Sequence, residues 1–424
     1  MCEALCIRLL ALVLLVACLV PRPAAAEVRV MIDWQGHPAM HIPWSFFAPG
    51  LTERAPKLTW RHQFKQTVHA PYLGDSGVRI FLMAAMAAEQ ARNPTQARRL
   101  ILRQLAYVEA FVAAHGDRYA LARSASEARR LLATTDKMVV VHSIEGGHHL
   151  LSDPADAAFW ASQGVALITL IHLRDDELGG AAILPMSIGP AINPRGAKLR
   201  KRGDRRGLTG RGKEAIVELD AAGILVDLSH MTHASIDDAL DVAEAHGIAP
   251  VVTHGKLARL RNTEMGFRDD QVVRIYRLGG VFSLGLDASK LDPIDPTAPV
   301  PDDVCPGTLE TFAMHTQAVR DLVQTHAAEI LGPAADSEEA RTRLAVGWSS
   351  DWNGWVNHSR PVYGVGRCRD VSALDDPLAV DTQGLAHPGL LPSHWERLER
   401  DGLDLDPMLR SAERFLQLWE QAGD

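Results

Sequence analysis

The sequence predicts an α/β protein folded as a single (β/α)8 barrel of the TIM type. Short apolar runs alternate along the chain with longer amphipathic segments, as in parallel strands joined by crossover helices. Eight such runs follow one another, and no Pro/Ser-rich linker or internal repeat divides the 424 residues. At roughly 150 residues per domain the length would also allow two or three domains, but one closed barrel with insertions reaches this size.

We assign each short apolar run to a strand and each amphipathic segment after it to a helix. The strands are expected at residues 28–34, 78–84, 138–144, 165–172, 224–230, 250–254, 280–286 and 344–351. The main helices are expected at residues 94–114, 153–162, 213–222, 233–245, 269–278 and 308–331. A series of β and α segments in this order predicts that the strands lie parallel in one sheet.

The composition is that of a globular protein, with 47% hydrophobic and 23% charged residues. This balance excludes a disordered, collagen-like or coiled-coil chain. The chain has 44 Lys and Arg against 52 Asp and Glu, a formal net charge of −8. Because that charge supplies no general attraction for a polyanion, we expect no nucleic-acid partner.

The first 26 residues are expected to be a secretory signal, which leaves residues 27–424 as the barrel domain. Arg8 precedes an apolar run over residues 9–20 that is too short to span a bilayer, and three alanines end at Ala26. The residues ending at Cys18 also fit a bacterial lipoprotein signal, which would leave a lipid anchor on Cys18. Both alternatives predict export, to the periplasm or medium or as a membrane-anchored lipoprotein.

Export changes the interpretation of the five cysteines. Cleavage after Ala26 removes Cys2, Cys6 and Cys18, so that only Cys305 and Cys368 remain. A pair of cysteines in an oxidising compartment is a candidate disulfide. Two separate buried thiols are an equal alternative, because the sequence does not show how close their Cα atoms lie.

Most predicted strands end on side chains of the kinds that bind metals or transfer protons. These strand-end residues are Asp33 to His37, His142, Glu145, His172, Asp227, His230, His254 and Asp351. A single histidine at a strand end is more often an ordinary polar residue. Together, however, these residues would meet at the carboxyl-end rim of a barrel, where active sites of this fold lie. Imidazoles with a shareable carboxylate are the ligands that two divalent cations require.

The motifs, in their order along the chain, resemble those of the membrane (renal) dipeptidase family. They are Glu145-Gly-Gly-His148, residues 164–172, Gly207-Leu-Thr209 with residues 222–231, residues 250–254, Arg261-Asn262 before Asp269, residues 347–354 and the final helices over 394–420. The resemblance covers nearly the whole mature chain. It implies a (β/α)8 barrel of the amidohydrolase type that binds two zinc ions and cleaves dipeptides, with tolerance for a D residue at the carboxyl side.

The resemblance also implies a set of metal ligands. Glu145 would be the carboxylate that bridges the two zinc ions, and His230 and His254 would complete one site with it. Asp351 would lie at the other zinc. Paired zinc ions lower the pKa of a bridging water and stabilise a tetrahedral oxyanion, as amide hydrolysis needs.

The resemblance further implies catalytic and substrate-binding roles. Asp351 would handle the proton of the attacking water and of the leaving amine, and Glu145 would act with it. His172 would polarise the scissile carbonyl. Arg261 would bind the free carboxylate of the substrate, since its guanidinium matches a carboxylate bidentately.

The first predicted strand departs from the family pattern. The family has His-x-Asp there, whereas this chain has Gln35-x-His37. Glutamine is a weak zinc ligand because its carbonyl oxygen is neutral. His37 still offers an imidazole, and His41 lies close enough in sequence to replace it. Three interpretations stay open: two metals with one weakly held, one metal only, or a site altered for other chemistry. A second departure is Asn353, where the family usually has Asp.

Two insertions shape the rim. Residues 173–212 carry a basic run: Arg195, Lys198, Arg200, Lys201, Arg202, Arg205, Arg206 and Arg211. This run is either a solvated loop or a lid that attracts an anionic substrate. The other insertion, residues 287–307, carries Cys305. Trp348, Trp352 and Trp355 lie around Asp351 in sequence and would line the pocket or pack in the core.

Together these observations predict an exported zinc-dependent dipeptidase that acts on a small peptide or a related amide. Two alternatives stay open: a hydrolase or lyase that modifies a secondary metabolite, and a metal-binding member of the family without dipeptidase activity. A homo-oligomer also stays open.

Overall fold

The computed structural model describes residues 30–60, 67–86, 91–204, 206–261, 263–291, 301, 303–332 and 337–422. The chain divides into two units, Met1–Val30 and Met31–Asp424. The expected signal sequence and Cys18 lie outside the described residues, as do Arg205 and Asn262. Among the described residues, no helix is both long and apolar enough to cross a membrane.

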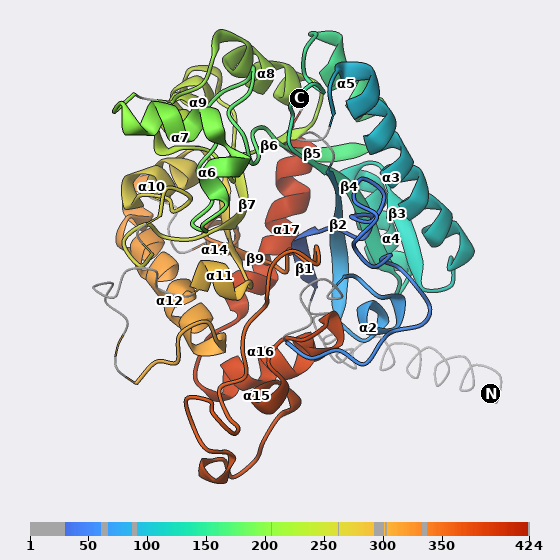
Figure 1. Ribbon diagram of the computed structural model, residues 1–424, viewed down its shortest axis with the longest axis vertical. Helices are drawn as coiled ribbons and strands as arrows, with labels where there is room; N and C mark the ends of the chain where they lie inside the picture. The colour runs from blue at the N-terminus through green and yellow to red at the C-terminus, as the bar shows by residue number, and fades with distance from the viewer. Residues whose placement is uncertain are drawn as a thin grey trace, which may run out of the picture. The chain divides into compact units, whose positions relative to one another are not determined.

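The unit Met31–Asp424 is a parallel barrel, which confirms the predicted fold class (Figure 1). Eight strands follow one another in the order β1-β2-β4-β5-β6-β7-β8-β9. The ring closes between its first and last strands, where Gly36 bridges Trp352 in parallel and the Ser350 amide donates to Asp33 at 2.9 Å. The strands are β1 Met31–Gly36, β2 Val78–Met86, β4 Met138–Glu145, β5 Val165–Thr169, β6 Leu225–Asp227, β7 Val251–Gly255, β8 Val281–Gly285 and β9 Val346–Ser349.

Several strands end at other residues than expected. Strand β1 continues through Gly36, so that Gln35 belongs to the strand. Strand β6 stops at Asp227 and β9 at Ser349, short of the expected 230 and 351. His230 and Asp351 have φ angles of 67° and 53°, and this left-handed backbone cannot continue an extended strand.

One strand was not expected from the sequence. Strand β3, Tyr119–Ala122, pairs in parallel with β4, from Tyr119 against Met138 to Ala122 against Val141. Strand β5 pairs with the second half of β4, from His142 to Glu145, while β2 runs along the opposite edge. Strand β3 therefore extends the sheet outside the ring and does not interrupt the barrel order.

Helices cover the outside of the barrel, and a helix is present at each of the six amphipathic segments predicted above. They are α2 Ala70–Gly74, α3 Pro94–Ala114, α4 Ala125–Thr134, α5 Ala155–Ser162, α6 Gly189–Ile192, α7 Pro194–Lys201, α8 Gly210–Ala221, α9 His233–His246, α10 Asp269–Arg277, α11 Ala288–Leu291, α12 Leu309–Thr325, α13 Ala327–Leu331, α14 Glu338–Arg343, α15 Ala379–Gln383, α16 Leu391–Arg400 and α17 Asp406–Gln421. The helix expected at 308–331 is divided in two at His326.

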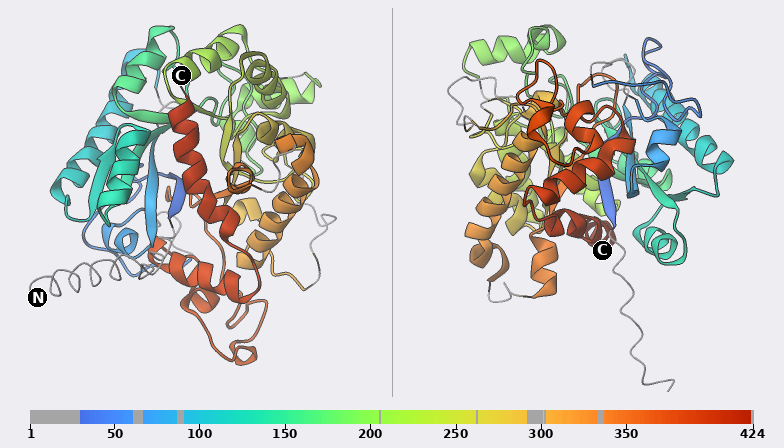
Figure 2. Two further views of the ribbon diagram at one scale, coloured as in Figure 1. Left: turned by 180° about the vertical axis from the view of Figure 1, so that it is seen from behind. Right: turned by 90° about the horizontal axis from the view of Figure 1, so that it is seen from below.

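The C-terminal helix α17 packs against the strands at which the barrel closes. Phe415 of α17 meets Trp34 of β1 edge to face, with ring centroids 5.3 Å apart. Arg129 of α4 donates to Glu413 of α17 at 2.8 Å. Figure 2 shows α17 running past the barrel strands in the view from behind. The helix therefore supports the strands from which Gln35 and Asp351 extend.

The cations of the basic insertion differ in their surroundings. Arg195, Lys198, Arg200, Lys201 and Arg202 are exposed. Arg206, in contrast, is buried at 7% exposure and forms ion pairs with Asp175 and with Glu264 of the loop after β7. The exposed cations lie in and just after helix α7, and both the solvated surface and the lid stay predictions. Arg206 fixes the insertion to a neighbouring loop.

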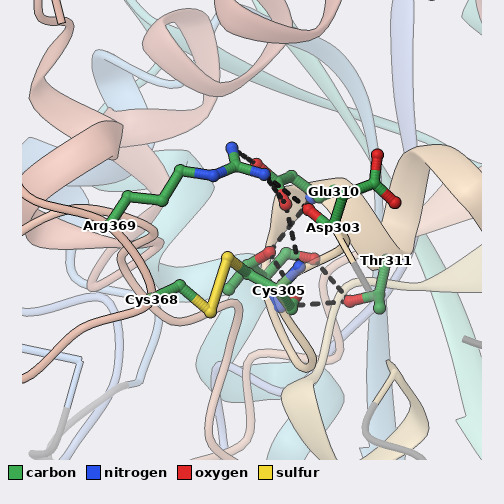
Figure 3. The surroundings of a disulfide bond; sticks show 7 residues. Asp303, Cys305, Glu310, Thr311, Cys368 and Arg369 are labelled. Carbon is green, nitrogen blue, oxygen red and sulfur yellow. Dashed lines mark hydrogen bonds and ion pairs between the residues drawn. A yellow bond between two sulfur atoms is a disulfide. The ribbon is translucent and has the colours of Figure 1, made fainter. Parts of the chain in front are cut away.

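Cys305 and Cys368 form a disulfide, with their Cα atoms 5.9 Å apart (Figure 3). The bond joins the insertion before α12 to the loop after β9. An ion pair between Glu310 and Arg369 lies beside it and connects the same two segments. Of the two alternatives left by the sequence, the structure therefore has the disulfide.

We expect Cys305→Ser to lower the free energy of unfolding by about 4 kcal/mol, because the disulfide closes a loop with a sequence separation of 63 residues. Urea unfolding with and without a reductant measures this change. Reduction should shift wild type to the variant's midpoint and leave Cys305→Ser unchanged. A wild-type midpoint that does not respond to complete reduction would contradict the prediction.

Candidate metal centre

The site is built around the carboxylate of Glu145, the last residue of β4, which is 3% exposed. Its Oε1 lies 3.2 Å from Nε2 of His230 and 3.4 Å from Nε2 of His254. Its Oε2 lies 3.2 Å from Nε2 of His37 and 3.3 Å from Nε2 of His172. One carboxylate therefore contacts four imidazoles, two at each oxygen.

These side chains come from the carboxyl ends of different strands. His37 follows β1, His172 follows β5, His230 follows β6, and His254 lies in β7. Because the strands are parallel, their carboxyl ends share one rim of the barrel. The convergence expected from the sequence is thus present, although the ligand and catalytic roles of these residues stay predictions.

A buried carboxylate beneath the cluster links three strands. Asp227 accepts hydrogen bonds from the hydroxyls of Thr169 (2.6 Å) and Thr253 (2.8 Å), and from the Ser229 amide (3.0 Å). The Thr253 hydroxyl also lies 2.7 Å from Nδ1 of His254. Asp227 and Thr253 therefore orient His254, as partners behind metal-binding histidines commonly do. The sequence marked Asp227 and Thr253 as strand-end residues, but did not indicate that Thr169 and Thr253 bind Asp227.

The first-strand side chains also face the cluster. Nε2 of His37 lies 3.5 Å from Oδ1 of Asp351 and 3.2 Å from Nε2 of Gln35. Oε1 of Gln35 is buried and has no hydrogen-bond partner among the described residues. Since the two ends of a carboxamide are assigned from their hydrogen bonds, Gln35 can present either atom to the centre. His41 packs against Tyr107 instead, with ring centroids 4.9 Å apart.

The electrostatics of the cluster favour a bound cation. Burial alone would raise the pKa of the Glu145 carboxyl, but the charges of His172 and His37 hold it well below its usual range. Burial alone would lower the pKa of His37, but Glu145 and Asp351 raise it to about 10. The buried carboxylates thus attract positive charge, which protons or a divalent metal ion can supply.

The donor atoms fit zinc. One atom each of Glu145, His230 and His254 lie within 4.8 Å of one another, and all three residues are buried. Imidazole nitrogens and carboxylate oxygens are ligands that zinc takes in proteins. These three residues could hold one ion, and His37, Asp351 and Gln35 lie where they could hold a second with the other oxygen of Glu145.

Asn353 holds Asp351 in place. Its Nδ2 donates to Oδ1 of Asp351 at 2.9 Å, while its Oδ1 accepts from the amides of Trp355 (2.6 Å) and Val356 (3.0 Å). A carboxamide both donates and accepts, so Asn353 connects the turn to the carboxylate. An ionised aspartate at this position could not donate.

The three tryptophans near Asp351 differ in their surroundings. Trp348 packs against Trp395 and Trp352 stacks on His358, with centroids 4.8 Å and 3.5 Å apart. Trp348 and Trp352 are fully buried and belong to the core. Trp355 is half-buried beside Phe47, so it alone keeps an exposed surface near the rim.

Arg261, predicted to bind the substrate carboxylate, lies on the loop after β7 and is 4% exposed. It shares its surroundings with Lys256 and His315. Burial and the positive charges of Lys256 and Arg261 lower the pKa of His315 to about 3. The neutral His315 therefore lies beside two buried cations.

Residues 37–335 match the model of the membrane dipeptidase family, peptidase family M19. The chain is 30% identical over 190 residues to the uncharacterized dipeptidase C965.12 of Schizosaccharomyces pombe, covering 45% of this chain and 41% of that protein. It is 25% identical over 226 residues to the dipeptidase verJ of Clonostachys rogersoniana, covering 53% and 50%. The chain thus spans half or less of the length of these curated relatives.

Solved structures share the fold. The dipeptidase AC, a metallo peptidase of family M19, superposes with a TM-score of 0.64 at 17% identity, covering 93% of this chain and 99% of that chain. A metallo peptidase from Rhodobacter sphaeroides, liganded with a phosphinate mimic of L-Ala-D-Ala, gives a TM-score of 0.63 at 17% identity over the same shares.

Proposed function

The chain belongs to the membrane dipeptidase family, and on this premise we propose that it is a zinc-dependent hydrolase that cleaves the amide bond of a dipeptide or a related small compound. The supporting observation is the Glu145 carboxylate, whose two oxygens each contact two imidazoles at the barrel rim. This arrangement suits two neighbouring cations that share one anion.

Glu145, His230 and His254 would hold one zinc ion, and Glu145, His37 and Asp351 would hold the other with Gln35 beside them. Bound there, zinc would supply an acidified water and electrostatic stabilisation of the developing oxyanion. Asp351 accepts the proton that the attacking water loses and returns it to the amine as the C–N bond breaks. His172, within the same cluster, donates a hydrogen bond to the scissile carbonyl oxygen.

Arg261 would orient the substrate through its free carboxylate. A guanidinium binds a carboxylate with two parallel hydrogen bonds, which fixes direction as well as distance. Burial of Arg261 at 4% exposure removes competing water from this contact. In a substrate bound through its carboxylate at Arg261, the length of the substrate would then set where its amide bond lies.

We expect Arg261→Lys to reduce kcat/KM for substrates with a free carboxylate by about tenfold to a hundredfold, or roughly 1.4 to 2.7 kcal/mol. The loss on the corresponding amides should be much smaller, because they make no bidentate pair. Steady-state kinetics on matched acid and amide substrates measures both. Equal losses on the two would remove Arg261 from this role.

The direct test is turnover of L-Ala-D-Ala and L-Ala-L-Ala by the purified, zinc-loaded protein. Hydrolysis of these dipeptides is the expected result. A protein that binds zinc but cleaves neither would contradict dipeptide hydrolysis. It would leave a hydrolase or lyase for another small metabolite, or a metal-binding member of the family without dipeptidase activity. Gln35 is the observation that favours other chemistry for a small metabolite, because it stands where the family pattern has an imidazole ligand.

Export is the remaining part of the proposal. It is supported by the apolar run over residues 9–20 before three alanines, and by the bond between Cys305 and Cys368. Cell fractionation and mass spectrometry of the mature N-terminus test it. A mature chain starting at Glu27 indicates a soluble exported protein, one starting at lipid-modified Cys18 indicates an anchored one, and an uncleaved cytoplasmic chain would contradict export.

A further inference from the structure

A second cluster of metal-binding side chains lies outside the centre around Glu145. His148 and His149 follow β4, and Glu177 lies on the loop after β5. Nδ1 of His148 is 2.5 Å from Oε2 of Glu177, and Nδ1 of His149 is 3.7 Å from Oε1. One donor atom from each of the three residues lies within 4.8 Å of the other two.

The backbone holds the two histidines in place. His149 has a φ of 61°, a left-handed conformation that few residue types adopt readily. Its amide donates to Oε1 of Glu177 at 2.7 Å. Before it, Gly147 packs so closely that an added Cβ would lie 2.8 Å from the Leu170 carbonyl oxygen. The loop after β4 therefore has little freedom to place these imidazoles elsewhere.

The loop that carries Glu177 is fixed independently. The Asp176 carboxylate accepts from the amides of Leu178 (2.8 Å) and Gly179 (3.1 Å). The hydroxyl of Thr209 donates to the carbonyl of Glu177 at 2.6 Å. Two loops, each held by its own hydrogen bonds, thus present three donors to one point.

A hydrogen-bonded clamp between the loops would need only one imidazole. The His148 ring alone makes a short contact, with Oε2 of Glu177. Nδ1 of His149 is too far from Oε1 of Glu177 for a hydrogen bond, and the His149 ring stacks on His148 with centroids 3.8 Å apart. A metal ion bound by both rings would explain why the His149 imidazole also lies beside Glu177.

We propose that His148, His149 and Glu177 form a further metal site, which takes a divalent transition-metal ion of the zinc type. Two imidazoles and one carboxylate are a set that zinc binds, and three protein ligands leave a coordination position for water. The side chains are 26%, 25% and 34% exposed, so an ion can enter from solvent. Bound metal would restrain the loops that follow Glu145 and His172.

The test is the number of zinc ions per chain after equilibrium dialysis of the full mature protein against zinc. His149→Asn should bind one ion fewer than wild type and keep its dipeptide hydrolysis. Asparagine tolerates the left-handed backbone at this position, and its carboxamide is a weak zinc ligand. The contact between His148 and Glu177 stays in this variant, so a loss of metal does not come from opening the loops.

His326→Asn is the matched control. His326 also pairs with a glutamate, Glu329, at 2.8 Å on an exposed surface, but that pair includes no second histidine. It should bind as much zinc as wild type. Glu177→Gln should lose the same ion as His149→Asn. Equal zinc counts in wild type, His149→Asn and Glu177→Gln would overturn the proposal. The comparison of counts does not depend on dipeptidase activity, so it stays decisive if no dipeptide is cleaved.

Discussion

Glu145→Gln should abolish zinc binding at the centre around this residue and lower kcat/KM for a dipeptide at least about a thousandfold, or roughly 4 kcal/mol of transition-state stabilisation. The carboxamide has nearly the shape of the carboxylate but no charge. In the native site this one charge lies among four imidazoles at 3.2 to 3.4 Å. Without it, neither oxygen position offers an anion to a cation.

Zinc analysis and steady-state kinetics measure these two effects separately. Glu109→Gln is a suitable control, because Glu109 also contacts a buried histidine, His142, at 3.3 Å, but lies on α3. It should keep both zinc and turnover. Full zinc content and undiminished turnover in Glu145→Gln would show that the centre lies elsewhere.

Asp351→Asn should lower kcat by about 10² to 10⁴, the range expected for loss of a general base. Asparagine keeps the size of the side chain but cannot accept the proton of the attacking water. Oδ1 of Asp351 lies 3.5 Å from His37 and accepts from Asn353, so the carboxylate is already held in place. We expect KM to change little, since substrate orientation comes from Arg261.

Circular dichroism and zinc content show whether the Asp351→Asn protein is folded and loaded before kcat is compared. Retention of the wild-type kcat in a folded, loaded variant would remove Asp351 from proton transfer. A variant that loses one ion together with its activity would instead show Asp351 acting mainly as a ligand.

The fold could be predicted because each barrel strand is an apolar run followed by an amphipathic segment. Strand β3 could not, because two of the four residues of Tyr119–Ala122 are alanines, which are depleted in strands. The ends of β6 and β9 were not predicted correctly either. The left-handed conformations of His230 and Asp351 keep these two residues out of the strands, and the residue types do not signal them.

The convergence of Glu145, His37, His172, His230 and His254 was predictable, since parallel strands bring their carboxyl ends to one rim. The hydrogen bonds that orient them were not. Serine and threonine hydroxyls occur throughout the chain, so nothing in the sequence distinguishes those that bind Asp227.

Gln35 is a residue whose position, but not its role, could be predicted from the sequence. The sequence located it beside the expected centre, and the structure places its side chain 3.2 Å from Nε2 of His37. Whether the first-strand site holds a second zinc ion stays a prediction, because it depends on the affinity of one neutral ligand among charged ones.

The centre around Glu145 is expected to hydrolyse dipeptides only when it holds zinc. Dipeptide turnover by chelator-treated protein is measured as zinc is added back. The metal-free chain should show no turnover, and turnover should recover as zinc fills the site formed by Glu145, His230 and His254. Undiminished turnover by a chain from which zinc has been removed would contradict this expectation.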